Sequence, residues 1–100
     1  MTKDNQIIAF KKLCNDAVQV MINKGDDYAN ADALSNFKNA GNIINLSAQK
    51  QCLSLISTKV ARLGNLIDNK TPKNESISDN ILDLFNYVAL LYMIQNEDNF

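Results

Sequence analysis

The chain has no histidine and no tryptophan, and only one proline, three glycines and two cysteines among its 100 residues. Without histidine, the Ser-His and Cys-His pairs of nucleophilic catalysis cannot form, and a zinc site would need unusual ligands. Cys14 and Cys52 make no CxxC pair, so we interpret them as two buried thiols in a reducing cytoplasm. Any hydrolysis would therefore depend on carboxylates with Mg²⁺ or Mn²⁺.

The chain also lacks an excess of charge of either sign, with 10 Lys and Arg against 11 Asp and Glu. A net charge of -1 and a pI near 5.2 argue against a general nucleic-acid binder, which would show a basic face. No apolar run approaches the roughly 20 residues that span a bilayer, and the first residues lack the apolar segment of a secretion signal. We therefore expect a cytoplasmic protein with no membrane contact and a single domain over residues 1–100.

Apolar residues are abundant and follow helical spacing. Rows three and four positions apart predict four helices, from Asp4 to Gly25, from Asp32 to Ile44, from Ser47 to Ile67 and from Ser76 to Tyr92. Asp32, Ser47 and Ser76 are the expected N-terminal caps. The polar stretch around Pro72 separates the last two helices, and the last six residues are expected to fray. The predicted fold class is all-α, a small bundle of about four helices.

Polar residues interrupt the apolar rows of the third and fourth predicted helices. Lys59 and Arg62 are three positions apart and share a face. Asp79, Asp83 and Asn86 follow i, i+4, i+7 spacing and share a face of the next helix. If the two helices fold back on each other, two cations meet two carboxylates, a group that we call the polar seam (Lys59, Arg62, Asp79 and Asp83). The fourth helix also carries two apolar rows, so it is either central in the domain or shared with a partner, and we expect a homo-oligomer.

Four segments of the chain match the pattern of a known family: K-G-D-D-Y-A-N, S-N-F, K-V-A-R-L-G-N-L and N-E-S-I-S-D-N-I-L-D-L-F-N-Y. Over roughly residues 20–92 the sequence resembles the small, mostly phage-encoded nucleotide-modification-associated proteins related to MazG-type all-α NTP pyrophosphatases. The resemblance implies a MazG-like core that dimerises through its helices. In MazG-type enzymes an ExxE pair and an ExxD pair bind Mg²⁺. In this sequence, Lys59 and Arg62 occupy the positions of the first acidic pair. Asn80 and Asp83 occupy those of the second, of which only the aspartate is kept.

One function is nucleotide or phosphorylated small-molecule binding without hydrolysis. Lys59 and Arg62 would hold the phosphate, while the polar face of the fourth helix would orient these cations or contact sugar and base. The remaining expected ligand-binding residues are Lys24, Asp27 and Tyr28 at the mouth of a pocket, and Tyr87 as a second stacking candidate. In a phage, such a protein would sequester a modified or signalling nucleotide in the host cytoplasm.

Two further interpretations stay open. The chain could be a Mg²⁺-dependent nucleoside triphosphate pyrophosphohydrolase with Asp79 and Asp83 as metal ligands. Alternatively, the polar seam could be a charge network that only holds the helical hairpin together in a structural or interaction protein. In the same way, Asp26 and Asp27 could be solvated turn residues and Tyr28 a packing residue.

Overall fold

The computed structural model describes residues 1–26, 32–69 and 76–100. Within these ranges the chain forms four α-helices and no strand. The helices are α1 (Lys3–Asp26), α2 (Ser35–Ile43), α3 (Ala48–Asp68) and α4 (Ile77–Gln95), and a 3₁₀ turn, η1 (Glu97–Asn99), follows them. The predicted all-α class and small helical bundle are therefore confirmed.

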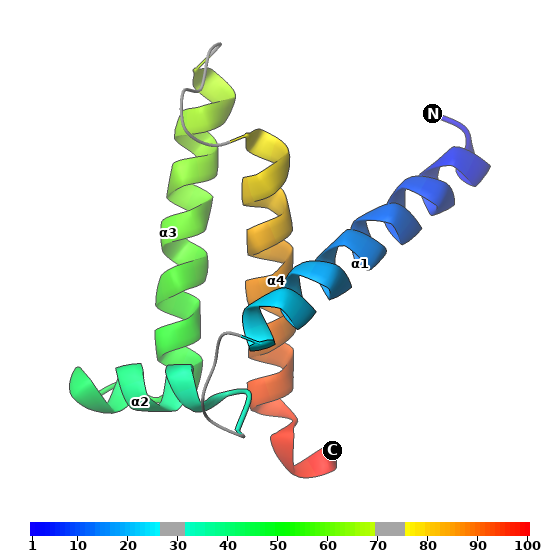
Figure 1. Cartoon of the computed structure of the whole chain (residues 1–100). Coiled ribbons are helices and arrows are strands. Elements are labelled where there is room, and N and C mark those ends of the chain that lie inside the picture. The colour runs from blue at the N-terminus through cyan, green and yellow to red at the C-terminus, as the bar shows by residue number, and fades with distance from the viewer. Residues whose placement is uncertain (27–31, 70–75) are drawn as a thin grey trace.

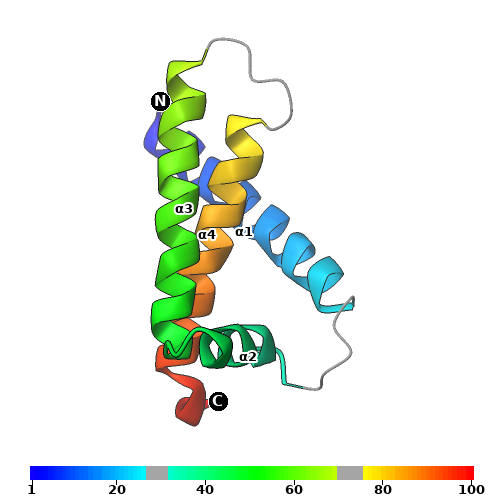
Figure 2. The same cartoon turned by 90° about the vertical axis from the view of Figure 1, so that its left-hand side faces the viewer.

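The centre of the fold is the antiparallel pair of α3 and α4, which lie side by side along most of their lengths (Figure 1). Helix α2 lies across the first turns of α3, close to the last turns of α4 (Figure 2). In Figure 1, helix α1 crosses α4 with its C-terminal half, and its N-terminal half extends away from the other helices. The C-terminal half of α1 and helix α2 thus approach the α3–α4 pair around one shared cavity.

Two of the three predicted helix caps are confirmed. Ser47 Oγ accepts a hydrogen bond from the Lys50 amide at 3.1 Å. Ser76 Oγ likewise accepts one from the Asp79 amide at 2.9 Å. Each bond satisfies an amide that the first turn of a helix leaves without a partner. These two serines therefore fix where α3 and α4 begin.

Three local predictions are wrong in detail. Asp32 accepts a hydrogen bond from the Leu34 amide at 3.0 Å and so closes a turn before α2 instead of capping it. Gly25 lies inside α1 and has no positive φ, so it is not the C-terminal cap. Cys14 is only partly buried, whereas Cys52 is fully buried. Pro72 lies outside the described residues, although α3 ends and α4 begins on either side of it.

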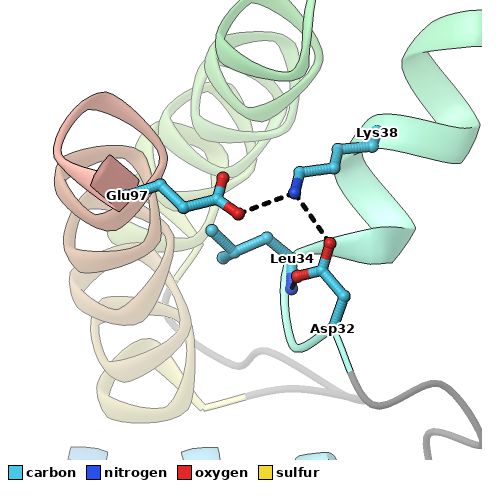
Figure 3. A network of polar contacts seen from close by, with 4 residues as sticks. All are labelled: Asp32, Leu34, Lys38 and Glu97. Atoms are coloured by element: carbon cyan, nitrogen blue, oxygen red, sulfur yellow. Dashed lines mark hydrogen bonds and ion pairs between the residues drawn. The ribbon is translucent and has the colours of Figure 1, made fainter. Parts of the chain in front are cut away.

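The expected fraying of the C-terminus is also wrong, because Lys38 holds it. The Lys38 ammonium lies 2.7 Å from Asp32 and 2.7 Å from Glu97 (Figure 3). Glu97 begins the turn η1, so this pair of contacts joins the start of α2 to the end of the chain. The hydrogen bond from Lys38 is the main influence that lowers the pKa of Asp32, and its bond to Asp32 is the main influence that raises the pKa of Lys38.

The hydrophobic core lies where α2, α3 and α4 meet. Its buried members are Leu34, Phe37, Cys52 and Ile94, and partly buried apolar residues of α3 and α4 surround them. The rings of Phe37 and Tyr87 form a T-shaped pair with a centroid distance of 6.5 Å, a favoured arrangement for aromatic pairs. The core is therefore small and concentrated at one end of the bundle.

Helix α4 is the most apolar element of the described chain. By length and composition alone, its 19 residues could cross a membrane, and it is the one described helix for which this holds. This finding corrects the expectation from the sequence that no apolar stretch approaches the length needed to span a bilayer. A central helix of a bundle meets the same criteria when it is mostly buried; α4 contacts both α3 and α1, but only 11% of its apolar window is buried.

Candidate functional site

A cavity of about 440 Å³ lies between the C-terminal half of α1, helix α2 and the α3–α4 pair. One wall is apolar and comes mainly from α2 and the end of α4. The other wall carries polar groups from α1, α3 and α4. The lining includes Lys24, Gln51, Asp83, Asn86 and Tyr87 on the polar side, and Met21, Leu34, Phe37, Leu55, Leu90 and Met93 on the apolar side.

Asp83 is the centre of the polar wall. Its carboxylate lies 3.2 Å from the Lys59 ammonium and 3.6 Å from the Lys24 ammonium. The predicted pairing of Lys59 with Asp83 across the helical hairpin is therefore present. The Lys59 side chain is 16% exposed and that of Lys24 is 53% exposed. Lys59 is thus the inner, constrained partner, and Lys24 is the outer partner at the rim of the cavity.

Asn86 and Tyr87 follow Asp83 along α4 and also line the cavity. Asn86 is buried, and its side-chain amide donates a hydrogen bond to the Ala17 carbonyl of α1 at 3.2 Å. This bond joins α4 to α1, as does the ion pair between Lys24 and Asp83. Tyr87 places its ring against Phe37 and its backbone carbonyl near the Cys52 thiol. Both residues therefore support the site as well as line it.

Gln51 is a cavity residue that the sequence interpretation missed. Its Oε1 atom is buried and accepts no hydrogen bond from the residues that the structure describes. A buried acceptor without a donor is costly, so this oxygen is a candidate contact for a bound N–H or O–H group. The signal was present in the sequence, since Gln51 lies four positions before Leu55 and eight before Lys59 on the same row of α3.

The structure does not bring the whole polar seam together. Asp79 is exposed and lines a separate hollow of about 270 Å³ with Lys12 and Asp16 of α1. Arg62 is exposed on α3, one turn beyond Lys59, and is not a lining residue of the main cavity. The reason is geometric: the row of Asp79, Asp83 and Asn86 faces α1 as much as α3. Asp27 and Tyr28, expected at the pocket mouth, lie outside the described residues.

The expected metal ligands, Asp79 and Asp83, stand one helical turn apart on α4. Asp83 is already shared by two ammonium groups. Among the residues described, no three His, Cys, Asp or Glu side chains gather as a metal site would require. Nothing in the described residues tests whether Asp79 and Asp83 bind Mg²⁺, so their role as metal ligands stays a prediction.

Comparisons of this chain with family models, with curated proteins and with solved structures find no match.

Proposed function

We propose that this chain binds a nucleotide or another phosphorylated small molecule in the cavity and does not hydrolyse it. The supporting observation is that four residues expected from the sequence, Lys24, Asp83, Asn86 and Tyr87, line one cavity. A largely apolar hollow with a few convergent polar groups is the usual form of a small-molecule site. The volume of about 440 Å³ falls within the range of about 300–1,000 Å³ for such sites.

The two lysines would have different roles. Lys59 holds Asp83 at the shorter distance and is largely buried, so it fixes the polar wall. Lys24 contacts Asp83 at 3.6 Å and is half exposed, so its ammonium can turn toward a phosphate at little cost. The apolar wall would take the base, and Gln51 Oε1 would accept a hydrogen bond from it. Tyr87 would bound the base on the side of α4.

Binding without hydrolysis agrees with the electrostatics of Asp83. A carboxylate with two ammonium groups beside it is a poor ligand for Mg²⁺, because the cations already neutralise it and repel the metal. The pyrophosphohydrolase function would need Asp79 and Asp83 to act together, whereas Asp79 faces a different hollow. The non-hydrolytic function therefore requires the smaller rearrangement.

Kinship with the MazG-related phage proteins, a homo-oligomeric state and a location in the cytoplasm are parts of the same proposal. The all-helical fold supports the kinship, whereas the Lys59–Asp83 ion pair is a departure from it, because Lys59 stands where a MazG-type enzyme has an acidic residue. Exposed apolar rows on α3 and α4 support the homo-oligomer. Nucleic-acid polymers are not expected partners, because the chain has a net charge of -1.

The test is a thermal-shift screen of the purified chain against nucleoside mono-, di- and triphosphates and cyclic dinucleotides, in EDTA and in Mg²⁺. A ligand that binds the folded state raises the melting temperature. Stabilisation in EDTA without phosphate release supports the proposal. A Mg²⁺-dependent shift with pyrophosphate release would establish the enzyme instead, and no shift with any compound would leave the charge network as structural.

Two lysine variants locate the site once a nucleotide hit is found. Lys24→Gln should weaken binding of that nucleotide at least about tenfold, since a hydrogen bond to a charged group contributes about 1.5–3 kcal/mol. Lys12→Gln is the matched control, because Lys12 pairs with Asp16 at 2.7 Å on the exposed surface of α1 away from the cavity. Equal affinities of the two variants would place the ligand elsewhere.

A further inference from the structure

The cavity offers one cation to a ligand. Lys24 and Asp83 are the only charged residues among its described lining residues. Lys59 lies 3.2 Å from Asp83 and its side chain is only 16% exposed, so its charge is balanced by that carboxylate. Two ammonium groups beside one carboxylate leave a single net positive charge at the cavity, and the half-exposed Lys24 carries it.

No further cation reinforces Lys24 from its surroundings in the described part of the chain. Lys38 of α2 is held between two carboxylates at 2.7 Å and is not a lining residue. The sequence that follows Lys24 brings Asp26 and Asp27, and residues 27–31, which lie outside the described ranges, include no Lys or Arg. The sequence neighbours of Lys24 can therefore add negative charge to the rim but no positive charge.

This charge balance suits a ligand with a single phosphate group. A phosphate monoester carries a charge of about -1.5 to -2 at pH 7. Lys24 can neutralise most of it, and water solvates the rest because this side chain is 53% exposed. Each further phosphate would add negative charge near Asp83 without gaining a cation, and like charges brought together at a binding site are strongly unfavourable. The cavity therefore favours a nucleoside monophosphate over a di- or triphosphate.

Gln51 marks the opposite end of the cavity from this phosphate position. It lies eight positions before Lys59 on the same row of α3, which corresponds to about 12 Å along the helix axis. Because Lys59 and Lys24 both contact Asp83, Gln51 is separated from the level of all three by about two helical turns. A nucleoside monophosphate has a comparable length, so a phosphate at Lys24 places the base near Gln51.

The polar group at this end of the cavity requires a donor. Gln51 Oε1 is buried and accepts no hydrogen bond from the described residues. Asn86, another amide of the lining, already donates its side-chain N–H to the Ala17 carbonyl at 3.2 Å. Adenine and cytosine carry an exocyclic amino group, which is a donor, whereas hypoxanthine and uracil carry a carbonyl oxygen at the same ring position. A carbonyl there would face Gln51 Oε1 as a second acceptor and leave it unsatisfied.

We infer that the ligand is a nucleoside monophosphate with an amino base, adenine or cytosine, whose phosphate contacts Lys24 and whose amino group donates to Gln51 Oε1. This inference rests on the proposed function, since it requires a nucleotide in the cavity, and it adds the ligand class. The number of phosphates follows from the charges around Lys24, and the kind of base follows from the orphaned oxygen of Gln51. Adenine and cytosine share the donor, and separate titrations distinguish between them.

The experiment is isothermal titration of the full chain in EDTA at about pH 7, where a monophosphate has the charge given above. AMP is compared with IMP, CMP with UMP, and AMP and CMP with their own di- and triphosphates. The better of AMP and CMP should bind at least about fivefold more tightly than its carbonyl counterpart, because the counterpart loses a hydrogen bond to a buried acceptor. It should bind at least about tenfold more tightly than its triphosphate, because of like-charge repulsion.

Two variants separate the two ends of the site. Gln51→Met keeps the length of the side chain but removes the acceptor, so it should abolish the preference for the amino base and keep the preference for the monophosphate. Lys24→Gln should weaken AMP and IMP by the same factor and leave their ratio unchanged. Gln19→Met is the matched control for Gln51→Met, because Gln19 bonds Asn23 at 3.0 Å on the exposed surface of α1 and does not line the cavity. It should change neither preference.

The unmodified chain decides the inference even if Gln51→Met fails to fold. Nucleotide binding that Lys24→Gln weakens, but with equal affinities for amino and carbonyl bases, would overturn the inference and leave the proposed function in place. Tighter binding of the triphosphate than of the monophosphate in EDTA would do the same. An amino-base preference that persists in folded Gln51→Met would overturn the role of Gln51. Binding of no nucleotide at all would overturn both the inference and the proposed function.

Discussion

The Lys38 ammonium lies 2.7 Å from the carboxylate of Glu97, a residue 59 positions further along the chain. This contact joins α2 to the turn that ends the structure, directly beside the core residue Leu34 (Figure 3). Lys38 also holds Asp32 at 2.7 Å, and Asp32 in turn accepts the Leu34 amide. One ammonium group therefore organises both the entry to α2 and the C-terminal end of the chain.

We predict that Lys38→Met lowers the melting temperature at neutral pH, because it leaves Asp32 and Glu97 without their shared cation. The decrease should be modest, since partly exposed ion pairs contribute little individually. Lys12→Met is the control, because it removes the more exposed pair with Asp16 and should change the melting temperature less. Equal effects of the two variants would show that the network around Lys38 has no special role.

The same network predicts a definite pH dependence. The pKa of Asp32 lies below its usual 3.8 mainly because Lys38 donates a hydrogen bond to it. The pKa of Lys38 lies above its usual 10.5 mainly through the bond to Asp32. The stability difference between the wild type and Lys38→Met should therefore be full between pH 3.8 and 10.5. It should disappear as the pH falls through the lowered pKa of Asp32, or rises through the raised pKa of Lys38. Urea unfolding at several pH values measures it.

Much of the fold could be predicted from local sequence, because its signals are local. The caps Ser47 and Ser76 act on amides three residues away, and the apolar rows identify which sides of the helices are buried. The C-terminal turn could not be predicted, since its order depends on the distant Lys38. The projecting half of α1 was also beyond prediction, because its apolar residues predict burial, whereas Ile7, Ile8 and Phe10 are each more than half exposed in the structure.

The site was partly predictable for the same reason. The pairing of Lys59 with Asp83 follows from two helices folding back on each other. Helical spacing alone cannot say that α1 crosses the polar row of α4, which separates Asp79 from Asp83 and buries Asn86 beneath Ala17. Gln51 was missed because a single glutamine is not a site signal by itself. Its position becomes informative only together with Leu55 and Lys59, which lie on the same row of α3.

Replacing a glycine by alanine should destabilise the fold at Gly41, near the end of α2, and stabilise it at Gly64, within α3. Leu46 donates to the Gly41 carbonyl at 2.7 Å and Asn45 adopts a φ of 59°, the pattern that terminates many helices. A Cβ on Gly41 would lie 2.6 Å from the Leu46 carbonyl oxygen. Gly41→Ala should therefore destabilise the fold by about 1–3 kcal/mol.

Gly64, within α3, is the matched control for Gly41. Nothing lies within 4 Å of a Cβ built there, so Gly64→Ala should stabilise by about 0.5–1 kcal/mol through helix propensity. Guanidinium unfolding measures both changes. Destabilisation by both substitutions, or by neither, would contradict the close approach at the end of α2.

The two thiols should differ in reactivity. Cys52 is fully buried with its sulfur 3.3 Å from the Tyr87 carbonyl, and burial raises the pKa of this thiol above 9.0. We expect Cys14 to react first with iodoacetamide at about pH 8, and Cys52 only after denaturant is added. Cys14→Ser should remove the fast reaction. Stability should also fall as the pH rises above 9.0, because the unfolded chain loses the Cys52 proton first. Rapid modification of Cys52 in the native state would contradict its burial.

Asp83 lies between a buried and an exposed ammonium, so its substitution should expose the difference between them. Asp83→Asn leaves Lys59, which is 16% exposed, without its carboxylate. We expect a loss of roughly 1–3 kcal/mol, the usual penalty for an unsatisfied buried polar group. Lys59→Met in the Asp83→Asn background should recover much of this loss, because it removes the charge that lacks a partner. Lys24→Met in the same background should recover little, since the Lys24 side chain is 53% exposed and water solvates it. Urea unfolding of the single and double variants gives both coupling energies. Equal recovery by the two lysine variants would contradict the greater burial of Lys59. It would mean that the ion pairs of Asp83 with Lys24 and with Lys59 contribute equally to stability.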